Sequence, residues 1–208
     1  MSESYFDRAA SGWDDQPRRV QLVKATGAAI LREVQLSKTM DVLDYGCGTG
    51  LLGLYLLAHV RSVTGADNSP GMLEVLNKKI SEGGLSTMRA IRLDLENDPV
   101  PDDRFDLVAV GMAMHHIADV DKVFLAIHTM LRPGGVLCIA DLDTEPGVFH
   151  PASRPVPHHG FDRDELKKRL EGHGFTGSRD VTVTTFAKPV EAGGEREFSV
   201  FLITSIRP

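Results

Sequence analysis

Apolar residues recur along this chain with two periods, one typical of strands and one typical of helices. An amphipathic helix is predicted from Pro17 to Val34, where a proline suits the first turn and apolar residues fall at helical spacing. Short apolar runs then alternate with helical segments. Strands are expected at 42–45, 62–67, 88–95, 105–111 and 136–141, and helices at 51–58, from residue 70 onward, and at 120–131. This alternation predicts an α/β fold with a parallel sheet.

The carboxyl-terminal third follows a different pattern. Residues 144–160 contain several prolines and no apolar period, which predicts a loop that is either a substrate wall or a plain surface excursion. A helix restarts after Asp162, whose spacing to Glu165 fits a capping box. Two β-branched and aromatic runs, 181–186 and 198–203, then flank a loop with paired glycines. They predict an antiparallel hairpin.

These elements predict one doubly wound, mostly parallel, seven-stranded Rossmann-like sheet that is closed by a C-terminal antiparallel hairpin. The length of 208 residues fits a single domain. We expect it to comprise an N-terminal lid and helix (1–38), a cofactor-binding core (39–143), a substrate-side loop (144–160) and a C-terminal helix and hairpin (161–208).

The most informative segment is a glycine-rich turn between the first strand and the next helix. It contains Asp44, Gly46, Cys47, Gly48 and Gly50. Glycines let the backbone adopt positive φ and approach a ligand, although a turn without a ligand is the plainer interpretation. Part of the same turn also satisfies a dinucleotide fingerprint. A carboxylate beside a pyrophosphate is repulsive, so Asp44 favours a ligand that carries an ammonium or sulfonium group.

A second acid ends the second predicted strand. Asp67 lies about 20 residues after Asp44, the distance at which a nucleotide-binding α/β fold presents an acid to ribose hydroxyls. The alternative is a solvated acid that caps the following helix, for which Ser69 is the predicted N-cap.

Composition narrows the function. The formal net charge is −6 and no Lys/Arg-rich run occurs, so the electrostatic footprint of a nucleic-acid binder is absent. The two cysteines, Cys47 and Cys138, do not form a disulfide framework and are expected to stay reduced. No signal peptide or membrane span is expected. The sequence therefore predicts a cytoplasmic monomer or homodimer that acts on a small-molecule substrate.

Several motifs occur together in a specific order. The Asp-x-Gly-x-Gly-x-Gly turn is followed by Phe-Asp-Leu-Val at 105–108, His-His-Ile at 115–117 and Leu-Arg-Pro-Gly-Gly at 131–135. Over residues 5–143 this arrangement resembles the class I S-adenosylmethionine-dependent methyltransferases, of the small-molecule type related to the quinone-biosynthesis methyltransferases. The resemblance implies S-adenosyl-L-methionine as cofactor and methyl transfer to a small molecule.

The resemblance also implies the residues around the cofactor. They are Tyr5, Trp13, Asp44, Gly46, Cys47, Gly48, Asp67, Asn68, Met72, Asp94, Leu95, Gly111 and Met112. In such enzymes the acid at Asp94 accepts from the adenine amine, the next backbone N–H reaches a ring nitrogen, and Met72 packs on the adenine. The N-terminal aromatic residues are expected to form a lid, or else a hydrophobic arm on the surface.

The paired histidines, His115 and His116, lie where related enzymes place substrate-facing groups. If the acceptor is a hydroxyl or a carbon acid, we expect one of them, with His116 favoured, to act as general base with an ionisation near about 6.5. Packing or capping beside Asp119 is the alternative. A metal site would need a third ligand from Asp141, Asp143 or the loop histidines, and none is expected.

Two other functions stay open. A nicotinamide-dependent oxidoreductase is disfavoured by Asp44 and by the predicted hairpin, because a dinucleotide domain would continue with parallel units. A cofactor-binding but catalytically silent interaction protein is the other alternative. No Asp/Asn-Pro-Pro-aromatic motif follows the fourth strand, which argues against methylation of a base amino group, and the low cysteine content argues against arsenite.

Overall fold

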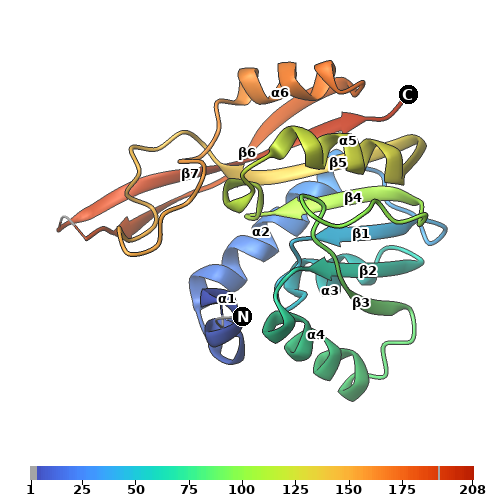
Figure 1. Cartoon of the computed structure of the whole chain (residues 1–208), viewed down its shortest axis with the longest axis horizontal. Coiled ribbons are helices and arrows are strands. Elements are labelled where there is room, and N and C mark those ends of the chain that lie inside the picture. Colours follow the sequence, from blue (N-terminus) through green and yellow to red (C-terminus); the bar gives the residue numbers. More distant parts are fainter. Residues whose placement is uncertain (1–3, 192) are drawn as a thin grey trace.

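The computed structural model describes residues 4–191 and 193–208 (Figure 1). Its centre is a seven-stranded sheet with the order β3-β2-β1-β4-β5-β7-β6, in which β7 runs antiparallel to both of its neighbours. The strands are β1 (Asp41–Tyr45), β2 (Ser62–Asp67), β3 (Met88–Arg92), β4 (Phe105–Gly111), β5 (Leu131–Leu142), β6 (Thr176–Pro189) and β7 (Glu195–Ile206). The predicted topology is confirmed.

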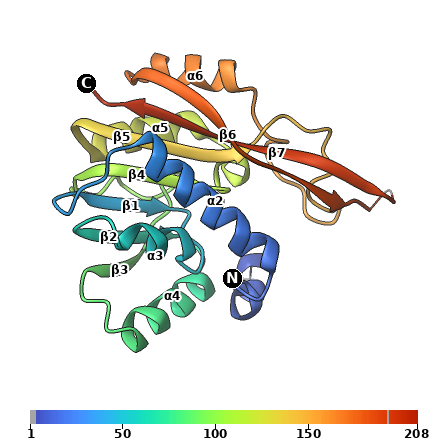
Figure 2. The same cartoon turned by 180° about the vertical axis from the view of Figure 1, so that it is seen from behind.

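Helices cover both faces of the sheet, and Figures 1 and 2 show the two sides. The helices are α1 (Tyr5–Ala9), η1 (Ala10–Gly12), α2 (Pro17–Glu33), α3 (Leu51–Leu57), α4 (Pro70–Glu82), η2 (Met114–His116), α5 (Val120–Met130) and α6 (Arg163–Gly172). Neighbouring residues of β1 point to opposite faces: Val42 packs with α2, α3 and α4, and Leu43 packs with α5 and α6. Each apolar strand is therefore buried on two sides.

The structure corrects several predicted boundaries. The hairpin strands β6 and β7 are longer than their apolar runs, and their outer half projects beyond the parallel strands together with residues 144–160 (Figure 1). Strand β5 begins at Leu131, the end of the predicted helix and five residues before the predicted strand, because buried Leu131 pairs with Phe105 and Gly134 absorbs the irregularity at φ 79°. Strand β3 ends at Arg92, before Asp94.

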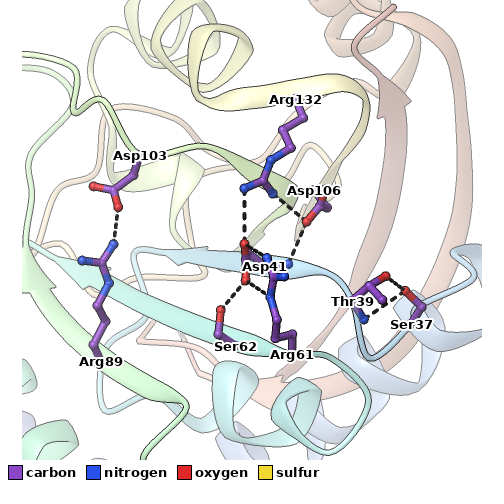
Figure 3. Close-up of polar contacts among 9 residues, drawn as sticks. All are labelled: Ser37, Thr39, Asp41, Arg61, Ser62, Arg89, Asp103, Asp106 and Arg132. Carbon is purple, nitrogen blue, oxygen red and sulfur yellow. Dashed lines mark hydrogen bonds and ion pairs between the residues drawn. The ribbon is translucent and has the colours of Figure 1, made fainter.

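The amino-terminal ends of β1 and β4 are joined by a charge network (Figure 3). Asp41 accepts from the Arg61 Nε at 2.8 Å and from Ser62 Oγ at 2.6 Å. Arg132 donates to Asp106 at 2.7 Å and to Asp41 at 3.3 Å. These donors, Arg61 foremost, hold the pKa of Asp41 well below its usual value. Every charge in this network has a partner of opposite sign.

Candidate cofactor and acceptor site

One cavity of about 620 Å³ lies at the carboxyl-terminal ends of β1, β2 and β4. This is where open α/β sheets bind ligands, and the volume is typical of a small-molecule site. Most of the residues predicted around the cofactor and acceptor line it, namely Trp13, Asp44, Gly46, Cys47, Gly48, Asp67, Asn68, Met72, Asp94, Gly111, Met112, His115 and His116.

The glycine turn forms one wall of the cavity. Its backbone conformation requires glycine at several positions. Gly46 has φ 69°, and a Cβ there would lie 2.5 Å from the Ala113 Cβ. Gly48 has φ 54°, and its Cα hydrogen face looks toward Met72 and Trp13 at ordinary contact distance. A Cβ on Gly48 would lie 3.8 Å from the Met72 Sδ and 3.9 Å from the Trp13 Nε1, so its absence leaves space in the cavity beside these two side chains.

Asp67 has its carboxylate at the end of β2 and is held by backbone donors. Gly48 N–H donates to one oxygen at 2.8 Å and Ser69 N–H donates to the other at 2.9 Å. The Asn68 N–H also donates to this carboxylate. A carboxylate has about four lone-pair sites, so acceptor capacity remains for a hydroxyl in the cavity. Burial raises the pKa of Asp67 despite these donors. The alternative role for Asp67 was to cap α4. The N-cap of α4 is Ser69, whose side chain accepts from the Met72 N–H.

Asp44 is almost completely buried beneath the glycine turn. Its Oδ2 accepts from Gly53 N–H at 2.8 Å, and among the described residues it has no cationic partner. Burial raises its pKa to about 7, and the nearby Asp67 acts in the same direction. A cation placed beside Asp44 would relieve both effects. The environment therefore agrees with the electrostatic argument made from the sequence.

The contact between the Leu95 N–H and adenine stays a prediction, and Leu95 is not among the residues that line the cavity. The Leu95 side chain lies in the core, and its backbone N–H donates to the Tyr45 hydroxyl at 3.0 Å. This N–H is thus already occupied, which the sequence did not indicate because Tyr45 lies 50 residues earlier. Asp94 does reach the cavity, where its carboxylate accepts from Glu96 N–H and the Asn97 side chain.

The N-terminal arm, residues 5–13, docks on the glycine turn and on α4. Asp7 accepts from Ser69 Oγ at 2.5 Å and from Gly71 N–H at 2.9 Å. Just beyond the arm, Asp14 accepts from Thr49 Oγ1 at 2.6 Å. The Phe6 ring lies 5.1 Å from the His116 ring, so the arm covers the acceptor side of the cavity. That the arm opens and closes stays a prediction.

The position of Tyr5 differs from the predicted one. Its ring is 37% exposed, lies outside the cavity lining, and packs under the Arg154 guanidinium at 4.2 Å from the ring centroid. Tyr5 is turned away because Phe6, its neighbour on the first helical turn, takes the inward position. Of the three N-terminal aromatics, only Phe6 and Trp13 face the cavity.

The paired histidines have different surroundings. His115 is 2% exposed, and its Nδ1 lies 2.7 Å from an oxygen of the fully buried Asp141. Its Nε2 lies 3.0 Å from the Nε2 of His150 in the 144–160 loop. His116 lines the cavity, and no hydrogen bond of its ring occurs within residues 4–191 and 193–208. Burial lowers the pKa of His116 to about 3, so the ionisation expected near neutrality is not supported.

The hydrogen-bond directions in this cluster follow from its two ends. Arg154 donates to the Nδ1 of His150, so a neutral His150 carries its proton on Nε2 and donates to His115. His115 then donates from Nδ1 to Asp141. Burial lowers the pKa of His150 to about 2, which keeps its ring neutral. The result is a one-way chain from Arg154 to Asp141.

The same cluster supplies the third ligand that a metal site would need. Nitrogen atoms of His115, His116 and His150 all lie within 4.8 Å of one another. A metal on the Nε2 of His150 would require that nitrogen to be free of its proton while Nδ1 accepts from Arg154. A guanidinium beside the ion would also be repulsive. The contacts therefore fit a hydrogen-bond chain better than a metal.

The sequence analysis missed several cavity residues that come from distant elements. They are Arg18 and Arg19 of α2, Tyr45 of β1, Phe149, His150 and Arg154 of the loop, and Phe186 and Lys188 of β6. Only the unusual loop, already a candidate substrate wall, pointed toward three of them. The side chains of α2 and β6 gave no signal because a lone Arg or Lys on a helix or strand is usually a solvated residue.

The sheet order with its antiparallel β7, the glycine turn, and the acids at the ends of β1 and β2 are those of the class I S-adenosylmethionine-dependent methyltransferase fold. Residues 42–135 match the family model described as methyltransferase domain. Residues 42–135 thus carry a methyltransferase domain, as the motifs indicated.

Similar proteins agree with this assignment. An uncharacterized methyltransferase of Schizosaccharomyces pombe is 36% identical over 135 residues, which are 58% of this chain and 48% of that protein. The demethylmenaquinone methyltransferase of Listeria monocytogenes is 30% identical over 114 residues, 53% of this chain and 48% of that protein. A SAM-dependent methyltransferase structure from Aquifex aeolicus has a TM-score of 0.71 at 20% identity and covers 99% of this chain and 100% of its own.

The curated relatives match this chain over only part of their length. The chain spans about half the length of the curated relatives that it matches. Among the helices of residues 4–191 and 193–208, none has the length and hydrophobicity that a bilayer crossing requires. The cytoplasmic location, the oligomeric state and the domain boundaries of the sequence analysis stay predictions.

Proposed function

We propose that this chain binds S-adenosylmethionine in the cavity and transfers its methyl group to a small-molecule acceptor. The observation that carries the proposal is that one cavity is lined both by the glycine turn with Asp44, Asp67 and Met72 and by His115 and His116. Cofactor-binding groups and candidate acid–base groups thus share one space. The alternative of a nicotinamide cofactor is disfavoured because the buried Asp44 and the half-buried Asp67 would face its pyrophosphate.

The residues fit the cofactor chemically. Asp67 would accept from the ribose hydroxyls, Met72 and Trp13 would flank the adenine beside Gly48, and Asp44 would face the positive charge of the methionine part. When bound, the cofactor supplies an electrophilic methyl group, and the transfer breaks its bond to sulfur with both electrons left on sulfur. Orientation of the acceptor alone can contribute about 7–11 kcal/mol to such a displacement.

His116 is the candidate general base. Its ring faces the cavity and makes no hydrogen bond within the described residues, so it is placed to take the proton of a hydroxyl or a carbon acid. Burial lowers its pKa to about 3, which makes the ring a weak base in the free chain. His115 has both ring nitrogens engaged by Asp141 and His150, which assigns it a positioning role. With a thiolate or free amine acceptor, no base is required and the two histidines would only shape the site.

Calorimetry with S-adenosylhomocysteine and with NAD tests the cofactor, and an Asp67→Ala variant reports whether binding uses this cavity. Transfer of a labelled methyl group into a small-metabolite extract tests the activity. We expect binding of S-adenosylhomocysteine but not NAD, together with a labelled product. Binding without any labelled product would favour the catalytically silent alternative. Binding of NAD alone would overturn the proposal.

A further inference from the structure

Three cationic side chains from three separate elements meet at the acceptor side of the cavity. Arg18 comes from α2, Arg154 from the 144–160 loop and Lys188 from β6. We call them the cationic cluster. Arg18 and Arg154 both lower the pKa of Lys188, after the larger effect of burial, which places the three charges within reach of one another.

The cationic cluster lacks counter-charges. Within residues 4–191 and 193–208, no carboxylate lies within 4.0 Å of Arg18, Arg154 or Lys188, whereas Arg61 and Arg132 on the opposite end of the sheet are both paired. The one acid that acts on Lys188 is Glu145, and its carboxylate is taken by the Val148 and Phe149 N–H groups.

Aromatic faces hold these cations in place of acids. The Arg154 guanidinium lies 4.2 Å from the Tyr5 ring centroid, and the Lys188 ammonium lies 4.3 Å from the Phe149 ring centroid. Arg18 lies 5.8 Å from Phe186. Such contacts orient a cation without neutralising it. In addition, the buried Nε of Arg154 has no hydrogen-bond partner among the described residues. This N–H therefore lacks an acceptor.

Outside the cationic cluster, the cavity is also lined by acids at the cofactor side and by Arg19, whose guanidinium packs over the Trp13 ring. Asp44, Asp67 and Asp94 receive backbone N–H groups and pair with no cation of the described chain. The cavity thus has its acids at one side and the cationic cluster at the other, although the whole chain is acidic. Arg154 also contacts His150 and acts electrostatically on His116, so the cationic part adjoins the candidate base.

We propose that the methyl acceptor is an anion, a small molecule whose carboxylate or phosphate group is bound by Arg18, Arg154 and Lys188. That the bound anion is a methyl acceptor rests on the proposed function. The anion site itself does not depend on methyl transfer. The anion supplies the counter-charge that the cluster lacks and an acceptor for the Arg154 Nε, whereas Lys188 already donates to the Phe149 carbonyl oxygen. Its negative charge favours the protonated form of neighbouring His116, which improves that residue as a base.

The test uses the whole chain, saturated with S-adenosylhomocysteine and also without it. Inorganic phosphate, benzoate and the neutral analogue benzamide are titrated by calorimetry at constant ionic strength, because salt screens such contacts. We expect benzoate or phosphate to bind and benzamide not to bind, and the better anion identifies the acceptor group. Equal binding of benzoate and benzamide, or no binding of either anion, would overturn the inference.

Variants locate the site. Arg154→Gln and Lys188→Gln should each weaken anion binding about tenfold, which corresponds to one charge-assisted hydrogen bond. Arg18→Gln, on the exposed rim, should have a smaller effect. Arg154→Lys should recover part of the affinity. The matched controls are Arg32→Gln, also on α2, and Lys78→Gln, whose side chains are 59% and 72% exposed outside the cavity.

The two proposals fail separately. If S-adenosylhomocysteine does not bind, the proposed function fails while the anion titrations of the free chain still stand. If S-adenosylhomocysteine binds but anion affinity is unchanged in all three cluster variants, the anion site is wrong and the methyltransferase proposal is unaffected. Melting temperatures should stay level or rise in the cluster variants, because unpaired like charges are removed.

Discussion

At the amino-terminal ends of β1 and β4, Asp41 and Asp106 share Arg132, and Arg61 completes the network. At the carboxyl-terminal ends of the same strands, Asp44 is buried without a cation, and the cationic cluster has no acid among the described residues. Charges that are paired hold the chain together. A charge without a counter-charge in or beside a cavity costs free energy in the absence of a ligand, so the unpaired groups indicate a binding role.

Four experiments test this difference between the two ends of the sheet. The largest effect is expected at His116. Its replacement by Ala should lower turnover about 10²–10⁴-fold if the acceptor is a hydroxyl or a carbon acid, with cofactor affinity nearly unchanged. Because its pKa is lowered to about 3, the neutral base persists at higher pH, and the wild-type rate should show no His116 ionisation near neutrality.

Controls make the histidine experiment decisive. His59→Ala removes an exposed histidine outside the cavity and should leave turnover unchanged. His115→Ala should also reduce turnover, by losing the Asp141 and His150 contacts that fix the site. Full activity in the His115→Ala, His116→Ala double variant would show that both histidines only pack.

The second effect concerns Asp67 and its counterpart Asp41. Asp67→Ala removes two charge-assisted hydrogen bonds to the ribose and should weaken S-adenosylhomocysteine binding about 10- to 100-fold. Asp41→Ala, at the opposite end of the sheet, should leave that affinity unchanged and lower stability by about 1–2 kcal/mol. Calorimetry and thermal unfolding of both variants distinguish the two roles. Binding by the Asp67 variant within about twofold of wild type would move the ribose site elsewhere.

The third effect is a pH dependence set by Asp44. Burial raises its pKa to about 7, so the carboxylate that would face a ligand cation forms only as the pH rises. Affinity for S-adenosylhomocysteine, which carries an ammonium group, should therefore rise about tenfold between about pH 6 and 8. Asp44→Asn should bind weakly with a flat profile. A wild-type affinity that falls over this range would contradict the assignment.

In the ligand-free chain, the effect of Asp44 on the free energy of unfolding has the opposite pH dependence. The folded state holds the Asp44 proton more tightly than the unfolded state does, where the pKa is about 3.9. The stabilising contribution of Asp44 to the free energy of unfolding is fully present below that value and is lost as pH rises through about 7. The raised pKa of Asp67 acts in the same direction. Unfolding measured with and without S-adenosylhomocysteine should show the loss only in the free protein.

The smallest effect is expected from Arg132→Gln. Its side chain is 38% exposed, so the loss of both ion pairs should cost only about 1 kcal/mol, or about 2–4 °C in melting temperature. Ligand binding should not change. Arg154→Gln gives the opposite result if the comparison holds, with weaker anion binding and no loss of stability. A larger stability loss at Arg154 than at Arg132 would make Arg154 a structural residue.

The sequence determined much of the fold and the cofactor side of the site. Alternating apolar runs specify the parallel sheet, and the carboxyl ends of adjacent parallel strands must meet at one edge. Asp44, the glycine turn and Asp67 therefore come together for local reasons: each follows directly from its own strand. The position of Asp67 next to Gly48 is the result, with the backbone hydrogen bond between them at 2.8 Å.

Only the tertiary structure decided the acceptor side. Arg18, His150, Arg154 and Lys188 lie on a helix, an irregular loop and a hairpin strand, and no period links them in the sequence. The loop approaches His115 because the extended hairpin supports it, with Phe149 packed on Phe198. Tyr45 likewise reaches Leu95 only in the folded core. Contacts of this kind depend on how distant elements pack, which residue spacing does not specify.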